Sequence, residues 1–484
     1  MMNLKSLTHF IVQPVFIFSS LFCVLTFLVA DHPFFWDTIP LASIPANWFY
    51  ENGLGDFILP MAHDNGNQPI LGIYLSIIWK VFGKTLAVSH FAMLPFLIGI
   101  VIQLQRIVKT FFPGSIITQS AVILAVLIEP TMLSQSALVS SDIVLIFFYL
   151  LCVNSILTNN RLLLAVALIG LGNISMRGSM MVVAILICDV LLSSNYSRQF
   201  LFDKLKRMIP AYVPALLIIC SWHLYHYIAT GWIGFHTESP WIESFEPMSN
   251  FDEFFHNIKM LVWLLVDYGK IALWIVAGLI LISKFRPKLG AHSKSIQLLI
   301  LMAAPLLVIS PTKLYYLHLM GSRYYLQIFI FLILFTLYLI FTLKHKTLKY
   351  SLYTLILVSL ITGHLWIYPE RLSQNWDGTL ARLPYFELRQ NMINYNDDET
   401  IPYEWIGTTF PNLSSMKYTD LTDDERAFAD KDLSSNKYVF YSNVFNEWTV
   451  DELAELHTNW EVVKEFSNWN IYVKLYKNPN TLSN

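Results

Sequence analysis

Long apolar stretches alternate with short polar segments in the chain before residue 369. A helix needs about 17 to 25 mostly apolar residues to cross a bilayer. Stretches that reach or approach this length lie near 10–30, 86–105, 115–133, 142–158, 162–176, 178–194, 209–229, 260–283, 297–315, 324–343 and 350–368. The pattern therefore predicts an all-α polytopic membrane domain over residues 1–368, with about 11 transmembrane helices.

The pattern changes after residue 368. Residues 437–444 and 470–477 have the alternation and the β-branched and aromatic content of strands, and residues 450–457 look like a short helix. We predict that residues 369–484 form a small α+β domain outside the membrane. The length of this segment is in the usual range for a domain.

Composition and charge support this division. The chain is 55% hydrophobic and only 14% charged, with a mean hydropathy of +0.50, whereas soluble domains carry about 25% charged residues. Residues 1–368 hold 22 basic and 15 acidic side chains, and residues 369–484 hold 10 and 19. Neither part has the clustered Lys and Arg of a nucleic-acid-binding face, so no nucleic-acid partner is expected.

The distribution of charge also predicts the orientation, because short cytoplasmic loops collect Lys and Arg. If the N-terminus is cytoplasmic, the predicted inner loops hold 14 basic residues and one acid, Asp203. The outer loop 230–258 then holds five acids and no base. We predict a multi-pass protein of the cytoplasmic (inner) membrane, surrounded by membrane lipids, with its C-terminal domain on the extracytoplasmic, periplasmic side.

The first predicted outer loop, residues 31–85, is long, and loops beyond about 15 residues are usually functional. Asp37 follows the first span closely, and Asp64 lies in the turn-rich sequence DNGNQP. Residues 69–82 are apolar but too short for a comfortable span, so we expect a helix along the outer membrane surface. Downstream, Asp142 begins a long apolar stretch, where a charge is costly unless it is paired.

These features resemble the C-type (GT-C) membrane glycosyltransferases, in particular the branch with the lipid A aminoarabinose transferase and the protein O-mannosyltransferases. The matching segments occur in the family's order: Asp37, GDFILP at 55–60, QPIL at 68–71, Phe82-Gly83, Ser141-Asp142, GLGNISMRG at 170–178 and SRYYL at 322–326. The resemblance covers residues 10 to 345 and implies a GT-C-like fold.

The resemblance implies transfer of a sugar, with inversion, from a polyprenyl-phosphate donor to an extracytoplasmic lipid, glycan or protein acceptor. This reaction needs a carboxylate that accepts the acceptor's proton and cations that hold the departing phosphate. We expect Asp37 to be the base, Asp64 to assist it and Asp142 to support the site. The expected ligands of the lipid phosphate are Arg177, Arg323, Lys313 and His318. Such cations can also simply anchor helix ends.

The chain departs from the family in the residue after Asp37. Thr38 stands where the family has a second acid, so participation of a divalent metal stays open. The sequence contains no P-loop and no GxGxxG after a predicted strand, so we expect no nucleotide cofactor. The expected cofactor set is therefore empty, with a divalent metal as the open alternative.

Several acids also have structural explanations. Asp37 and Asp142 are suitable helix N-caps, and Asp64 suits an Asx turn. Asp267 and Lys270 lie three residues apart, a spacing that favours an ion pair along one helix.

Two other functions fit a chain with many spans. A polysaccharide polymerase or ligase usually has its large outer loop late in the chain, whereas the large loop here is the first. A transporter or flippase would be expected to have two related halves and helices broken near the membrane midplane, and the sequence has no internal repeat.

Overall fold

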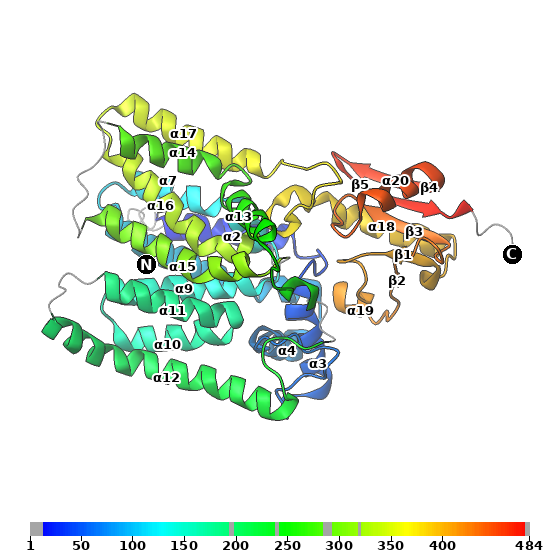
Figure 1. Ribbon diagram of the computed structural model, residues 1–484, viewed down its shortest axis with the longest axis horizontal. Helices are drawn as coiled ribbons and strands as arrows, with labels where there is room; N and C mark the ends of the chain where they lie inside the picture. The colour runs from blue at the N-terminus through cyan, green and yellow to red at the C-terminus, as the bar shows by residue number, and fades with distance from the viewer. Residues whose placement is uncertain (1–12, 193–197, 238–241, 284–292, 318–320, 480–484) are drawn as a thin grey trace, which may run out of the picture.

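The computed structural model describes residues 13–192, 198–237, 242–283, 293–317 and 321–479. Long helices run side by side through most of the molecule, and a small sheet lies at one end of this helical body (Figure 1). The helices are α2 (Pro14–Leu28), α5 (Leu86–Phe91), α6 (Leu94–Phe111), α7 (Ile116–Leu127), α8 (Pro130–Ser136), α9 (Ser141–Leu157), α10 (Arg161–Asn173), α11 (Met176–Leu191), α12 (Arg198–Thr230), α13 (Phe251–Val266), α14 (Ile271–Ile282), α15 (Lys294–Tyr315), α16 (Leu326–Thr342) and α17 (Lys346–Gly363).

Every predicted span coincides with one of these helices or with two consecutive ones. Within the described ranges, four helical segments are long and apolar enough to cross a membrane, or six if each of two bent pairs counts as one span. A multi-pass membrane protein fits this composition. The count of eleven spans and the orientation of the termini stay predictions.

Two predicted spans are bent. The axes of α7 and α8 make an angle of 76°, and those of α13 and α14 an angle of 87°. The first bend follows from Glu129-Pro130, because proline suits the first position of a new helix and the Glu129 carboxylate caps α8 by accepting the Met132 N–H at 2.7 Å. Both predicted spans are therefore broken helices rather than continuous ones.

The two bends are joined by a buried ion pair. Lys270 Nζ lies 3.1 Å from Glu129 Oε1, and both side chains are buried. The expected local pair of Lys270 with Asp267 is therefore wrong: the break between α13 and α14 lets Lys270 contact α8, and Asp267 accepts a hydrogen bond from the Tyr368 hydroxyl.

The first outer loop contains three short helices, η1 (Ile39–Ser43), α3 (Ile44–Asn52) and α4 (Ile70–Phe82). They lie at the end of the helical body nearest the sheet (Figure 1). One face of α4 is buried, with Leu71, Leu75 and Trp79, and the opposite side exposes Ile77 and Val81. Apolar side chains therefore lie on both sides of α4, and the exposed ones fit the expected position along the outer membrane surface.

The C-terminal part contains α18 (Pro384–Asp398), α19 (Met416–Thr419) and α20 (Val450–Asn459) beside one five-stranded sheet. The strands are β1 (Ile406–Thr408), β2 (Ala429–Asp430), β3 (Tyr438–Ser442), β4 (Glu461–Asn468) and β5 (Ile471–Lys477). Their order is β2-β1-β3-β5-β4, parallel among the first three and antiparallel from β3 to β4. The strands expected from sequence are β3 and β5, and the expected short helix is α20.

The C-terminal core contacts the helical body directly. It includes Phe35 from the first outer loop and Leu138 from the segment between α8 and α9. The ring of Phe35 meets that of Phe386 edge-on, with centroids 5.3 Å apart. The Phe34 N–H also donates to the Thr419 carbonyl at 2.8 Å. The first outer loop is thereby held between the sheet and the long helices.

Candidate active site

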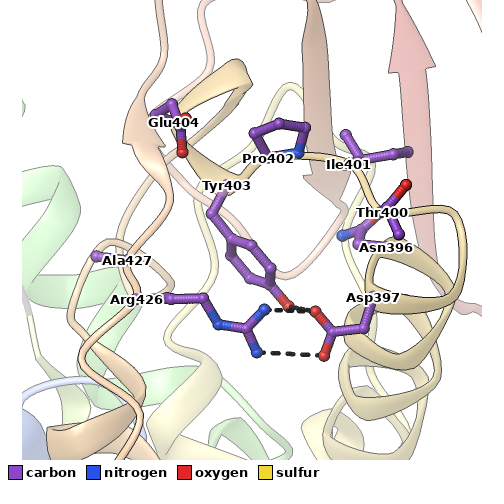
Figure 2. Close-up of a pocket in the computed structure, with 9 residues that line it drawn as sticks. All are labelled: Asn396, Asp397, Thr400, Ile401, Pro402, Tyr403, Glu404, Arg426 and Ala427. Carbon is purple, nitrogen blue, oxygen red and sulfur yellow. Dashed lines mark hydrogen bonds and ion pairs between the residues drawn. The ribbon is translucent and has the colours of Figure 1, made fainter.

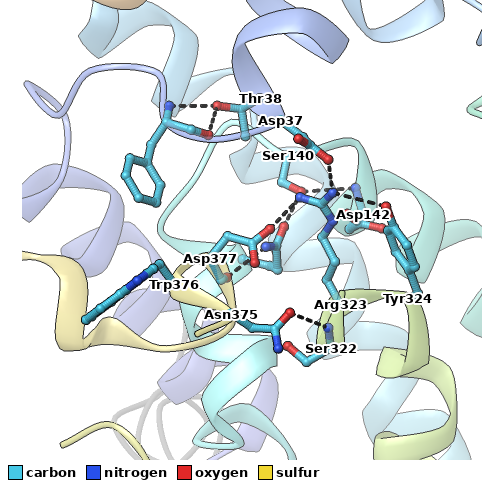
Figure 3. A network of polar contacts seen from close by, with 12 residues as sticks. Asp37, Thr38, Ser140, Asp142, Ser322, Arg323, Tyr324, Asn375, Trp376 and Asp377 are labelled. Carbon is cyan, nitrogen blue, oxygen red and sulfur yellow. Dashed lines mark hydrogen bonds and ion pairs between the residues drawn. The ribbon is translucent and has the colours of Figure 1, made fainter. Parts of the chain in front are cut away.

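A buried arginine collects three carboxylates at this junction. Arg323 lies in the short helix η3 (Ser322–Tyr325) that precedes α16. Its guanidinium donates hydrogen bonds to Asp37 and Asp377, and its Nε lies 3.4 Å from Asp142 Oδ2 (Figure 3). Residues that lie far apart in the chain therefore share one charge network, which we call the Arg323 cluster: Arg323, Asp37, Asp142, Asp377 and Arg177.

Asp37 reaches the cluster through a tight turn. The Thr38 hydroxyl donates to the Phe35 carbonyl at 2.7 Å and accepts the Phe35 N–H at 2.9 Å, and Trp36 adopts a left-handed φ of 57°. This turn directs the Asp37 carboxylate at Arg323, so the carboxylate does not act as the N-cap that was the structural alternative.

Asp37 is also the most accessible acid of the cluster. Its side chain is 15% exposed, against 3% for Asp142 and 4% for Asp377. Oδ2 of Asp37 accepts from Arg323, and within the described part of the chain Oδ1 has no hydrogen-bond donor. One carboxylate oxygen therefore remains available to a substrate.

Asp142 connects the two arginines. It lies in the first turn of α9, where the cap is Ser140, whose hydroxyl accepts the Asp142 N–H at 3.1 Å. The Asp142 carboxylate is free of this task, and Oδ1 accepts from Arg177 Nη1 at 2.5 Å. The cap and the charge site are thus separate residues, and the buried Asp142 carboxylate is available for charge-assisted pairing.

Arg177 lies in the first turn of α11 and remains 18% exposed. Its guanidinium stacks on the Tyr324 ring at 4.0 Å. The start of α11 is fixed by Asn67 of the first outer loop, whose Oδ1 accepts the Met176 N–H at 3.1 Å. Among the described residues, only Nη1 of Arg177 has a hydrogen-bond partner, so the guanidinium has donors left for an anion.

Asp377 was not expected from the sequence. It lies in a turn after α17, and its carbonyl accepts from the Ser134 hydroxyl at 2.7 Å and from the Gln135 amide at 2.9 Å. A Cβ on Gly378 would lie 2.3 Å from the Ser322 hydroxyl, so glycine allows the turn to approach η3. Burial raises the pKa of the Asp377 carboxyl, although the Arg323 guanidinium beside it opposes this effect.

A second buried arginine holds this turn in place. Arg382 donates to the Ser134 hydroxyl, to the Thr379 carbonyl at 2.7 Å and to the Trp376 carbonyl at 3.2 Å. Burial lowers the pKa of Arg382 to about 10, so it remains charged at neutral pH. The C-terminal part thus supplies Asp377 to the Arg323 cluster, and Arg382 holds the Asp377 turn against α8.

Asp64 lies in a different set of contacts. Its Oδ1 accepts the Gly66 N–H at 2.9 Å, which is the Asx turn of the structural alternative, and its Oδ2 lies 2.8 Å from His226 Nε2. Gly66 has φ 75°, and a Cβ there would lie 1.8 Å from the Gly234 carbonyl oxygen. No contact joins Asp64 to the Arg323 cluster within the described ranges, so the structure does not bring the two expected catalytic acids together.

Lys313, another expected ligand of the lipid phosphate, is not part of the cluster. Lys313 is buried near the end of α15, and its amine donates to the Leu317 carbonyl at 3.4 Å. His318 lies outside the described residues. Among those that are described, no group of three or more His, Cys, Asp or Glu side chains could hold a metal ion.

No protein-family model and no curated protein matches this chain. Among solved structures, the chain is similar to the arabinofuranosyltransferase AftD from Mycobacteria, determined by single-particle cryo-electron microscopy, with a TM-score of 0.50 and 11% sequence identity. The likeness covers 96% of this chain, which spans 39% of the length of that protein. At this identity the likeness concerns the fold, which the chain shares with a glycosyltransferase.

Proposed function

We propose that this chain is an integral-membrane glycosyltransferase. It moves a sugar, with inversion, from a polyprenyl-phosphate donor to an extracytoplasmic lipid, glycan or protein acceptor. The observation that carries the proposal is that one buried charge network holds two partly exposed groups, the Asp37 carboxylate and the Arg177 guanidinium. The fold likeness to an arabinofuranosyltransferase supports the same reaction class and makes a pentosyl donor the first to test.

Asp37 acts as the base in this reaction. The acceptor hydroxyl gives its proton to Asp37 Oδ1 while its oxygen bonds to the anomeric carbon of the sugar. The bond from that carbon to the phosphate oxygen breaks, and its electron pair stays with the phosphate. Because the acceptor enters opposite the leaving phosphate, the anomeric configuration inverts. A positioned base of this kind typically contributes a factor of about 10² to 10⁴ in rate.

Arg177 binds the departing phosphate. Negative charge grows on the phosphate as the bond breaks, and a cation placed beforehand stabilises it. Arg323 was expected in the same role, but its guanidinium is buried and directed at three carboxylates. We therefore assign Arg323 as a positioning residue that orients Asp37. Lys313 is buried, and its amine donates to the Leu317 carbonyl, so we give it no part in the step.

The bent helices are a feature that a transporter would share, but their location favours the enzyme. The Tyr268 hydroxyl, at the break between α13 and α14, donates to the Asn375 carbonyl at 2.9 Å. The helix α8 that follows the other break contacts the Asp377 turn through Ser134. Both breaks thus lie at the end of the bundle that carries the sheet, whereas transporter sites lie near the midplane.

Transfer by the full chain in lipid nanodiscs tests the proposal. The protein is incubated with radiolabelled polyprenyl-phosphate arabinose or polyprenyl-phosphate hexoses and with extracted envelope lipids and glycans as acceptors. We expect the label to move to an acceptor with the wild type and not with Asp37→Asn. Absence of transfer from every donor, or equal transfer by the variant, would contradict the proposed reaction or the role of Asp37, respectively.

A further inference from the structure

A cavity of about 510 Å³ lies in the C-terminal part, and its lining residues are separate from the Arg323 cluster. It forms where the C-terminal end of α18 meets η6 (Tyr403–Trp405) and the loop before β2 (Figure 2). Sites for small ligands typically enclose about 300 to 1,000 Å³. The cavity therefore has the size of a ligand site, and no step of the proposed reaction uses it.

The cavity has an unpaired amide in its wall. Asn396 is fully buried, and within the described residues neither its amide nitrogen nor its amide oxygen has a hydrogen-bond partner. Its nitrogen turns toward Tyr403, whose own hydroxyl donates to Asp397 at 3.1 Å (Figure 2). A buried unpaired amide is costly. A ligand that supplies both an acceptor and a donor would remove this cost.

The charges around the cavity disfavour an anion. Arg426 donates to Asp397 at 2.6 and 3.2 Å and to Asp424 at 2.7 and 2.9 Å, and its guanidinium stacks on Tyr403 at 4.4 Å. All three of its nitrogens are thereby directed at carboxylates that the protein supplies. With the exposed Glu404 at the rim, three acids surround one base, so a phosphate or carboxylate would be repelled.

The unpaired amide disfavours a lipid. The apolar part of the lining comes from Ile401, Pro402, Ala427 and the Tyr403 ring. An alkyl chain would leave the Asn396 amide unpaired, whereas a hydroxyl group can donate and accept at once. A ligand with several uncharged hydroxyl groups matches both the amide and the excess of carboxylates, and a glycan has this chemistry.

One rigid element connects the cavity with the reaction site. The helix α18 begins at Pro384, two residues after the Arg382 that fastens the Asp377 turn, and it ends beside the cavity at Asp398. Its 15 residues give a length of about 22 Å. We propose that the cavity binds an uncharged oligosaccharide, as a holding site for a glycan acceptor. The acceptor role rests on the proposed function, but the binding itself does not.

Binding is tested on the full chain in lipid nanodiscs by saturation-transfer difference NMR. The uncharged probes are galactotriose, mannotriose and arabinotriose, and trigalacturonic acid is the anionic counterpart of galactotriose. We expect saturation transfer to at least one uncharged probe and much weaker transfer to the anion. Asn396→Leu should lower the affinity for the best-binding probe by about tenfold, the equivalent of one good hydrogen bond.

Asn396→Leu keeps a similar volume and removes only an unpaired amide, so it is not expected to unfold the protein. Glu404→Ala should also weaken binding, and Asp423→Ala, an exposed acid outside the cavity, is the matched control that should leave it unchanged. The proposal is overturned if no uncharged probe binds, if the anion binds as well as galactotriose, or if Asn396→Leu has no effect.

The binding experiment and the transfer assay together separate the glycan site from the proposed function. If an uncharged probe binds but no donor supports transfer, the glycan site stands and the transferase assignment fails. If transfer occurs and no trisaccharide binds, the glycan site alone fails. If both hold, Asn396→Leu should raise the KM for an oligosaccharide acceptor and leave kcat nearly unchanged, because the cavity is remote from the bond that forms.

Discussion

Asp37 and Asp64 belong to the same outer loop, yet the structure surrounds them in opposite ways. Asp37 faces an arginine, is partly exposed and has one oxygen without a donor among the described residues. Asp64 is buried. One of its carboxylate oxygens accepts the Gly66 N–H, and the other is hydrogen-bonded to His226 Nε2. In the proposed reaction the first meets the acceptor, whereas the second fastens the loop to α12.

Accessibility separates the acid proposed for the chemistry from the acid that holds the loop. Asp64 holds a turn whose neighbour Asn67 accepts the Met176 N–H at the start of α11, so the influence of Asp64 on Arg177 is indirect. The Arg323 cluster shows the same division within itself. Its accessible members are Asp37 and Arg177, and its buried members, Asp142, Asp377 and Arg323, orient them.

The largest expected difference is between the two loop acids themselves. Asp37→Asn should lower the single-turnover rate of transfer by about 10³-fold, because the proton acceptor is lost. Asp64→Asn should lower it by less than about tenfold, because it loses one charged contact of a structural turn. Rapid-quench measurement with a lipid-linked donor distinguishes them. Equal losses would mean that exposure does not separate their roles.

Arg323 provides the next largest effect, on stability. Arg323→Met removes the charge that three buried or half-buried carboxylates share, and breaking such a network typically costs about 3–5 kcal/mol. Arg426→Met is the control, because Arg426 is 48% exposed and exposed pairs contribute about 1 kcal/mol or less. Chemical unfolding in nanodiscs compares the two. Similar losses in both variants would argue against a buried network.

For Arg177 we expect an effect on donor binding. Arg177→Gln should lower the affinity for the polyprenyl-phosphate donor by about 10- to 100-fold, since a charge-assisted hydrogen bond is lost. Arg161→Gln is a matched control, because Arg161 also pairs with a buried aspartate, Asp189, and is similarly exposed, but belongs to a separate ion pair. Equilibrium binding of the donor measures both. Unchanged affinity for the Arg177 variant would remove it as the phosphate ligand.

The smallest expected effect concerns pH and the turn before Asp37. Burial lowers the pKa of His32 from 6.5 to about 4. The unfolded chain therefore binds a proton that the folded chain excludes, so stability falls as the pH drops from about 6.5 to about 4, by about 1 kcal/mol after allowance for partial exposure. Thermal unfolding at a series of pH values should show this slope in the wild type and less of it in His32→Gln. An equal slope would exclude His32 as its source.

The helices could be predicted because their signal is local. Each predicted span coincides with one or two helices, and strands β3 and β5 were found by alternation. The broken helices were predicted as continuous because apolar content alone does not report a bend; the Glu129-Pro130 sequence was the signal for one of them. Strands β1 and β2, with three and two residues, are too short for a pattern to reveal.

The candidate site was predictable only in part. Asp37, Asp142, Arg177 and Arg323 were recognised from motif order, and the structure brings these four together. Asp377 was missed because its turn carries no periodic pattern and lies in the C-terminal part. The pairing of Lys270 with Glu129, rather than with Asp267, depends on two bends that meet in space.

The sequence by itself determined that the chain is a membrane protein with an acidic C-terminal part, because hydropathy and charge are sums over local positions. It also selected the first outer loop as the informative segment. Only the tertiary structure decided which acids share one arginine, which of them remains accessible, and that the C-terminal part contributes Asp377 to the Arg323 cluster. These depend on contacts between residues far apart in the chain, and burial, which sets the cost of each charge, is a property of the packed molecule.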